Sequence, residues 1–409
     1  MAIYARDNRK EILMSNKVAT EDTLQKIATL VGVIAGGGET DDWPSLKKLV
    51  DEGYAEEMYP VGSQIVDAWE AAAGTSYDVP WDVVHYNDAG DMFLKWHYGF
   101  PTAIAFDAPE AIYYAPAGGL AAGQYYITIG MNYGNGWKAG DHINFTLAND
   151  MAAGDQLVLS TATDNKNDPT DGMAWNVYAA GSTTSKENGV TSNSDTGTEL
   201  GSTSATGAGY TNGNINAPQR VVYGYNRYSQ SAIRQWLNSA EAAGSWWTAQ
   251  NGWDRPPAQA TTVRGFLAGC SEEFIRSIET ADVVTAINTV EGAVETYETT
   301  HDKIFLPSLQ EMYITPQLAN TEGEDWDYYK ELAEEAGLTG KFAQGSTYPI
   351  MKTYYINNKT SACHARLRSA NRGNANPTWC ITSSGGVSGN YGAYVACSGS
   401  PACIIKKSE

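Results

Sequence analysis

Seven short segments between residues 79 and 161 constrain the fold of this chain more than any other feature. Each is rich in Val, Ile, Phe, Tyr or Trp, and turn-forming residues separate it from the next, as in NYGNGWKAGD at 132–141. β-Branched and aromatic residues favour strands, and regularly spaced turn residues indicate a β-sandwich. We therefore predict strands at 79–86, 92–100, 102–108, 111–116, 124–130, 142–147 and 156–161.

Helical patterns lie on both sides of these strands. Apolar residues three and four positions apart, with capping residues before them, predict helices at 20–37, 45–60, 229–244 and 271–280. Ser271 is the expected N-cap of the last of these, and Ser308 to Glu311 has the spacing of a capping box. Helices followed by small strands predict an α+β fold class.

Size and charge exclude several classes of protein. The chain has 409 residues, 42% of them hydrophobic, which suffices for two or three domains. It contains no run of eighteen apolar residues, and its first sixteen residues lack the apolar core of a secretion signal, so we expect no membrane insertion and no signal peptide. The net charge of −20 argues against nucleic acid as a partner, because phosphate binding needs a basic face.

The charge is distributed unevenly along the chain. No Asp or Glu occurs from Ala336 to Ser408, where eight Lys and Arg residues give a charge of +8 and leave −28 for the rest. These cations either face an acidic neighbour or ligand, or lie against the acidic body of the same protein.

Groups that resemble catalytic residues have simpler structural explanations. His301, Asp302 and Ser308 lack the G-x-S-x-G elbow of many hydrolases, and Ser308 is explained as a helix cap. The acids of 321–337 could form a glycosidase pair or a calcium site, but acids also belong at the start of a helix. We therefore expect no enzymatic activity.

Metal and thiol motifs are equally weak. DNKNDPTDG at 164–172 resembles a calcium loop, but Lys166 and Pro169 stand where a ligand and a glycine are needed. The five cysteines are odd in number and lack C-x-x-C spacing, which argues against a zinc site and a disulfide framework. Cys363 and His364 are adjacent and would point to opposite faces of a strand. We therefore expect no cofactor and no metal.

Four phrases in the second half of the chain resemble a known family. They are YGYNRYSQSAIRQWLNS at 223–239, GWDRPP at 252–257, HDKIFLPSLQEMY at 301–313, and RLRSANRGNANPTWCITSSGGVSGNYGAYVACSGSPACII at 366–405. They look like the C-type-lectin-fold domains of the variable proteins of diversity-generating retroelements in bacteria and phages, of which a phage tropism determinant is the best-known kind. The likeness covers about 218–405.

The resemblance implies a domain organisation. A C-type lectin-like ligand-binding domain would comprise 59–100 and 218–409, with an inserted β-sandwich-like domain at 101–217. Residues 1–58 would form a short helical N-terminal segment for attachment or oligomerisation. Within the insert, the Ser/Thr/Gly/Asn-rich tract at 181–216 is expected to be an exposed loop or a run of irregular β edges.

In that family a reverse transcriptase copies a template repeat with errors at adenines, so AAC codons change to a set of residues that excludes Lys, Glu, Gln and Met. These four make up 61 of the 409 residues here, yet none occurs in 363–400. The depletion agrees with the resemblance, and it also fits an ordinary Gly/Ser-rich loop.

The resemblance further implies which residues would bind a ligand. Trp379 and Ile381 alternate with Cys380 and Thr382, so we expect one face of a strand to be buried and the other displayed. The expected ligand-binding positions are Pro377, Thr378, Cys380, Thr382, Gly386, Ser388, Gly389, Tyr391, Tyr394, Cys397 and Ser398.

These expectations together describe a phage tail receptor-binding protein, made in the host cytoplasm and placed in the virion at the tail tip or fibre. Its partners would be a host cell-surface protein or glycan and other virion tail proteins, and a homotrimer would add avidity. The alternatives are a bacterial surface adhesin of the same fold, a purely structural tail protein, and an enzyme related to the formylglycine-generating group, which would need a reactive cysteine pair or a copper-type site.

Overall fold

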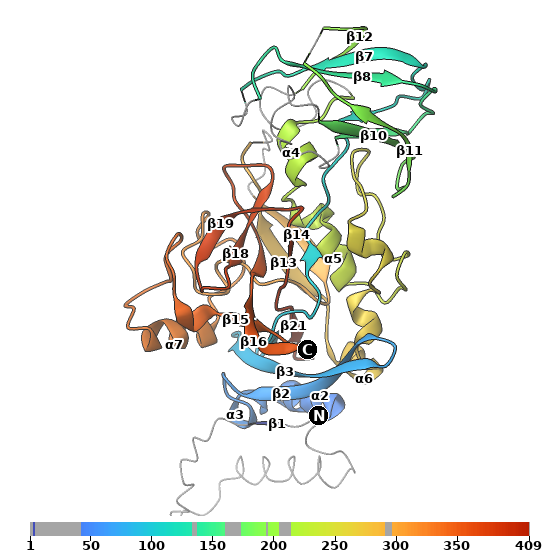
Figure 1. Cartoon of the computed structure of the whole chain (residues 1–409). Helices are drawn as coiled ribbons and strands as arrows, with labels where there is room; N and C mark the ends of the chain where they lie inside the picture. The colour runs from blue at the N-terminus through green and yellow to red at the C-terminus, as the bar shows by residue number, and fades with distance from the viewer. Residues whose placement is uncertain are drawn as a thin grey trace, which may run out of the picture.

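Strands predominate in the computed structural model, which describes residues 3–4, 42–132, 137–159, 173–193, 195–203, 214–290 and 297–408 (Figure 1). The structure is 35% strand and 17% helix. The six α-helices of the described residues are each ten residues long or shorter. The predicted α+β class is therefore wrong, and a mostly β fold of several small sheets replaces it. Of the predicted helical segment 1–58, residues 43–58 contain two short helices, and residues 5–41 lie outside the described ranges.

The largest sheet joins the two ends of the described chain. Its order is β1-β2-β3-β4-β21, and β21 pairs antiparallel with β4, so that Ala402 lies opposite Lys95. Beneath it, the rings of Trp69 and Trp81 lie 5.2 and 5.9 Å from Trp96, edge to face. Such aromatic packing stabilises a dry core. The strands are β1 (Ile3–Tyr4), β2 (Gln64–Ala72), β3 (Thr75–Tyr86), β4 (Met92–Trp96) and β21 (Ala402–Ile405).

Two further sheets lie at one end of the molecule and enclose a separate cluster of buried side chains drawn from residues 112–222 (Figure 1). One has the order β11-β10-β9-β6 and the other β12-β7-β8. The strands are β6 (Tyr113–Tyr114), β7 (Gly123–Thr128), β8 (His142–Leu147), β9 (Gln156–Leu159), β10 (Ala174–Tyr178), β11 (Ser185–Val190) and β12 (Thr198–Ser202).

Four small sheets form the rest of the body. They are β13-β14, β15-β16, β17-β18-β19 and β20-β5. The last pairs residues 104–105 with 396–397, and so places the start of the 101–217 region beside the C-terminal stretch. Their bounds are β5 (Ile104–Ala105), β13 (Ala281–Ala286), β14 (Tyr297–Asp302), β15 (Thr353–Tyr355), β16 (Asn358–Cys363), β17 (Ala365–Ala370), β18 (Pro377–Ile381), β19 (Val387–Gly392) and β20 (Ala396–Cys397).

The helices are shorter than the sequence predicts. The pattern at 45–60 forms two helices, because Gly53 adopts a left-handed conformation (φ 78°) that ends the first. The helix predicted at 20–37 lies outside the described residues. The bounds are α2 (Trp43–Glu52), α3 (Ala55–Met58), α4 (Pro218–Tyr223), α5 (Ala232–Leu237), α6 (Glu272–Ser277) and α7 (Asp327–Glu335), with 3-10 turns η1 (Tyr228–Gln230), η2 (Ala258–Thr261), η3 (Phe266–Gly269) and η4 (Pro349–Met351).

The predicted caps form, but they do not lead to long helices. Ser271 accepts a hydrogen bond from the Phe274 N–H, as an N-cap should, and α6 stops one turn later. Ser308 and Glu311 make both bonds of a capping box around a turn that no helix follows. In the described part of the chain, no helix is long and apolar enough to cross a membrane.

Candidate functional site

The stretch that carries the predicted ligand-binding positions forms the sheet β17-β18-β19 and the short strand β20. Arg366 in β17 lies opposite Cys380 in β18, which in turn lies opposite Ser388 in β19. The framework residues Trp379 and Ile381 are buried, as the alternation predicts. This face of the sheet is part of the hydrophobic core.

The opposite face of β18 is buried too, which corrects the prediction of a displayed face. Both Thr378 and Cys380 have no exposed surface. Seven predicted ligand-binding positions are buried and offer no side-chain surface to a ligand: Pro377, Thr378, Cys380, Gly386, Gly389, Cys397 and Ser398. Four are half-buried and reach the surface: Thr382, Ser388, Tyr391 and Tyr394.

The side chain of Arg366 packs against the face of β18 that the sequence predicted to be displayed to a ligand. Its Nη1 donates to Thr378 Oγ1 at 2.5 Å and to the Tyr391 carbonyl at 2.9 Å. Its Nη2 donates to the carbonyls of Gly392 at 3.2 Å and Val395 at 2.6 Å. Among the described residues no carboxylate pairs with this fully buried guanidinium. A buried charge needs compensation, and here carbonyl dipoles and a hydroxyl provide it.

These bonds hold the turn at 391–395, which is also anchored from two other segments. The Tyr394 N–H donates to the Tyr223 carbonyl at 2.9 Å, and the Ala393 N–H donates to the Asn376 carbonyl at 2.9 Å. The turn therefore presents the half-buried rings of Tyr391 and Tyr394 from a backbone that three elements fix. Both tyrosines are among the predicted ligand-binding positions, whereas the sequence did not indicate the role of Arg366.

All five cysteines are free thiols, and two of them, Cys380 and Cys397, lie next to Arg366. Burial raises the pKa of Cys380 to about 12 and that of Cys363 to about 11. Burial also raises the pKa of Cys397, against the opposing effect of Arg366, whose Nη2 lies 3.1 Å from Cys397 Sγ. These thiols are therefore protonated at neutral pH, the state of structural cysteines.

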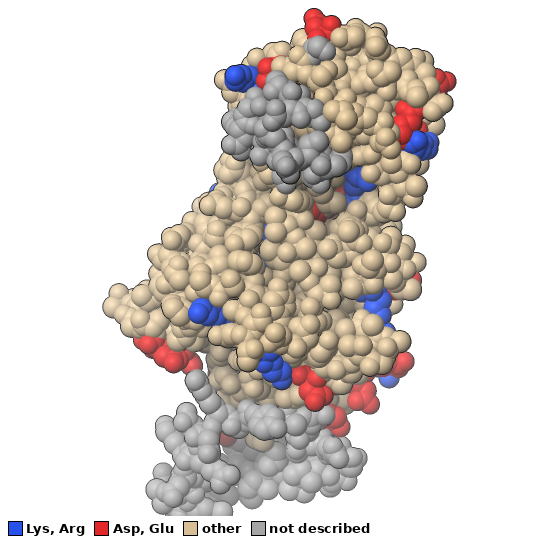
Figure 2. All heavy atoms as spheres, in the orientation of Figure 1, with Lys and Arg blue, Asp and Glu red and all other residues tan. Residues whose placement is uncertain are grey.

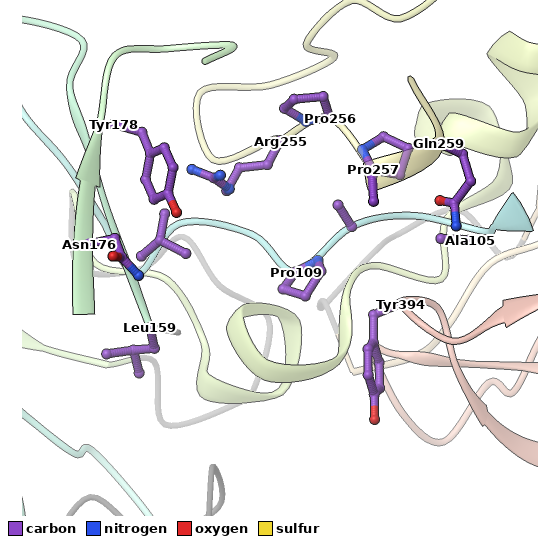
Figure 3. Close-up of a pocket in the computed structure, with 13 residues that line it drawn as sticks. Ala105, Pro109, Leu159, Asn176, Tyr178, Arg255, Pro256, Pro257, Gln259 and Tyr394 are labelled. Atoms are coloured by element: carbon purple, nitrogen blue, oxygen red, sulfur yellow. The ribbon is translucent and has the colours of Figure 1, made fainter. Parts of the chain in front are cut away.

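A cavity of about 350 Å³ opens beside Tyr394, between strands β9 and β10 on one side and residues 255–259 on the other. Figure 3 shows its walls: Asn176 and Tyr178 come from β10, Arg255 and Gln259 from the loop before and into η2, and Tyr394 from the turn described above. Pro109, Pro256 and Pro257 add an apolar surface. The cavity thus combines one cation, two amides, two aromatic rings and prolines.

Arg255 is the most distinctive group in this cavity. Its guanidinium lies 3.8 Å from the centre of the Tyr178 ring, and the two groups are adjacent in Figure 3. Burial lowers the pKa of Arg255. Within the described residues, Nη1 of Arg255 and Oε1 of Gln259 are buried without a hydrogen-bond partner. The sequence feature that points to Arg255 is the phrase GWDRPP at 252–257. In it, a charged pair precedes two prolines, which cannot continue a helix or a central strand.

Three buried acids, Asp107, Glu110 and Asp254, adjoin cavity-lining residues in sequence and form a cluster with Arg220. Glu110 accepts from Nε and Nη2 of Arg220, both at 2.6 Å, and both side chains are fully buried. Burial raises the pKa of Asp254 to about 7, and burial together with Asp254 and Glu110 raises the pKa of Asp107 well above its usual range. One arginine cannot neutralise three carboxylates, so Asp107 and Asp254 keep their protons at pH values at which free carboxylates are ionised.

The groups that resembled catalytic residues do not assemble. His301 Nδ1 lies 2.7 Å from Asp282 Oδ1 on an exposed face of β13-β14, while Asp302 pairs with an arginine of α5. The buried Ser308 hydroxyl donates to the Glu322 carbonyl at 2.6 Å. Across the described ranges, no three His, Cys, Asp or Glu side chains are arranged to hold a metal ion. The stretch 164–172 lies outside those ranges.

The structure also shows where several of the C-terminal cations lie. Arg366 and Arg368 are buried, and Arg368 pairs with Glu311. Lys341 pairs with Asp325. These three cations therefore lie against the protein itself. Figure 2 shows few charged side chains over the middle of the visible face, where β18 and β19 lie in the same orientation.

Comparison with known proteins adds one finding. Residues 209–407 match the family described as a domain of unknown function, DUF6273, a stretch that includes Arg255, Arg366 and Tyr394. No curated protein and no solved structure matches the chain. The second half of this chain is thus similar to a family that is described without a function.

Proposed function

We propose that this protein is a receptor-binding protein of a phage tail, which attaches to a host-surface molecule through Tyr391, Tyr394 and the adjoining cavity. The observation that carries the proposal is the turn at 391–395, which Arg366 holds from inside while its two tyrosine rings reach the surface. The resemblance of 218–405 to diversified variable proteins supports the same function.

The geometry suits recognition for physical reasons. Tyrosine offers a large contact area and loses little conformational entropy when it binds, so rigidly held tyrosines act as anchors in binding surfaces. The predicted positions that reach the surface, Thr382, Ser388, Tyr391 and Tyr394, are uncharged, whereas the adjoining cavity contains the cation Arg255. The uncharged side chains would select partners by shape and hydrogen bonds, and the cavity would add selection by charge.

The partner would be a protein or glycan of the host surface, and the other end of the chain would attach to virion tail proteins. By the same resemblance the assembly is a trimer. Three copies on one tail convert a weak contact into tight attachment, because the second and third binding events are intramolecular.

A cell-retention assay tests the proposal. Purified protein is incubated with a panel of bacterial strains, and the dissociation constant is measured on any strain that retains it. Replacing Tyr391 and Tyr394 with Ala together is expected to weaken retention by about tenfold or more. Tyr126→Ala is the matched control, because Tyr126 is a half-buried tyrosine in β7, at the far end of the molecule.

Two results would overturn the proposal. One is that no strain retains the wild-type protein. The other is that the double variant binds as well as Tyr126→Ala.

A further inference from the structure

We propose that the cavity beside Tyr394 binds an acidic sugar, whose carboxylate pairs with Arg255. The inference rests on the proposed function in one respect, since it takes the sugar to be part of a host-surface glycan. Three features of the cavity point to such a ligand: the charge of Arg255, the amide side chains in its walls, and its size and apolar surface.

The charge of Arg255 has no acidic partner among the described residues. The nearest acid in sequence, Asp254, accepts hydrogen bonds from the backbone N–H groups of Gln250 at 2.8 Å and of Arg255 itself at 2.9 Å. Tyr178 contacts the guanidinium but contributes no negative charge. A largely buried cation without an anion is costly, and a bound carboxylate would compensate it. The planar guanidinium fits a carboxylate with two parallel hydrogen bonds.

The amide side chains specify more than an anion. Gln259 lines the same cavity as Arg255. Asn176 contributes a second amide from the β10 wall. A sugar supplies the hydroxyl donors that such amides bind, whereas inorganic phosphate or a fatty acid offers no comparable set.

The remaining walls suit one face of a sugar ring. Pro109, Pro256 and Pro257 present apolar surface, and Tyr394 lies at one end of the cavity in Figure 3. The volume of about 350 Å³ is at the small end of the range for ligand pockets, roughly 300–1,000 Å³. It accommodates one small ligand, so we infer that a single acidic residue of a glycan enters it.

The test compares two probes that differ in one group. Glucuronate and glucose are titrated separately into the full chain, and binding is followed by saturation-transfer NMR. Glucuronate is expected to bind at least about tenfold more tightly than glucose, because only glucuronate carries the carboxylate. Arg255→Gln should remove that preference. Arg276→Gln is the control, since it removes the same charge from an exposed site in α6.

Arg255→Lys is a second variant that tests the site even if Arg255→Gln does not fold. It keeps the positive charge and loses the fork of donors, so it should bind glucuronate more weakly than the wild type and still prefer it to glucose. Equal binding of the two sugars by the wild type, or an unchanged preference in Arg255→Gln, would overturn the assignment. Equally strong binding of inorganic phosphate would overturn it too, because the site would then be a general anion site.

The cell-retention assay separates this inference from the proposed function. If strains retain the protein but glucuronate neither binds nor displaces it, the acidic-sugar assignment fails and the receptor-binding function stands. If glucuronate binds through Arg255 but no strain retains the protein, the site stands and the receptor-binding function fails.

Discussion

Nη2 of Arg366 donates to the carbonyl oxygen of Val395 at 2.6 Å, which ties a fully buried side chain of β17 to a turn at the surface. The same guanidinium contacts Thr378 and Cys397, two residues that the sequence pattern assigned to a displayed face. One interaction therefore explains why that face is filled and why the turn is held.

Replacing Arg366 with Met should destabilise the fold and loosen the turn. Met keeps the apolar stem of the side chain but donates no hydrogen bond, so the buried Thr378 hydroxyl and three carbonyls lose their donor. We expect a loss of about 3 kcal/mol in the free energy of unfolding, measured by urea denaturation, and faster amide exchange at 393–395. Arg276→Met, at an exposed position, should change stability by less than about 0.5 kcal/mol. Equal effects in the two variants would refute the role of Arg366.

The ion pair of Arg368 with Glu311 should be much more sensitive than an exposed pair. Glu311 receives Nη2 of Arg368 at 2.8 Å and Nη1 at 2.5 Å, and both side chains are buried. Glu311→Gln removes the carboxylate that the buried guanidinium contacts directly, at an expected cost of about 3–5 kcal/mol. Glu272→Gln, which breaks the exposed pair with Arg276, should cost less than about 1 kcal/mol. Thermal unfolding of both variants provides the comparison.

Position 389 should tolerate less variation than its neighbour. A Cβ atom at Gly389 would lie 2.9 Å from the buried ring of Trp379, closer than van der Waals contact allows. Gly389→Ala is therefore expected to lower the free energy of unfolding by about 1–3 kcal/mol, and Ser388→Ala by less than about 0.5 kcal/mol. If Gly389→Ala is as stable as Ser388→Ala, the sheet adapts more readily than its packing indicates.

Stability should fall as pH rises from about 4 to about 7. Burial raises the pKa of Asp254 to about 7, whereas an unfolded chain releases that proton near pH 4. Between these values the folded state binds more protons than the unfolded state, so deprotonation favours unfolding. Asp107, whose pKa is also raised, contributes in the same direction.

Asp254→Asn should flatten part of this dependence, because Asn stays neutral at every pH. The measurement is the urea midpoint at pH 4.5, 5.5, 6.5 and 7.5. Asp88→Asn, at an exposed turn residue, is the control and should keep the slope of the wild type. A slope that Asp254→Asn leaves unchanged would contradict this account of the cluster.

The correction of the fold class has a physical cause that the helix at 271–280 illustrates. The Ser271 cap and the acids after it start a helix, but only long-range pairing decides how far it continues. Ile278 lies in extended backbone, and Glu279 bridges to Ile404 near the end of the chain. Helix signals of this kind therefore gave segments of fewer than three turns in a mostly β structure.

The sequence by itself determined the features that depend on neighbours a few residues apart. Each of the seven strands predicted between 79 and 161 overlaps an observed strand, although those at 102–108 and 111–116 are only two residues long. The Ser271 cap and the reciprocal bonds of Ser308 and Glu311 form as well, because side-chain alternation and capping act locally. Only the tertiary structure decided which face of β18 is buried and where a cavity opens. Arg366 reaches β18 from another strand, and the cavity joins 105–109, 176–178, 255–259 and Tyr394, segments that no local pattern brings together.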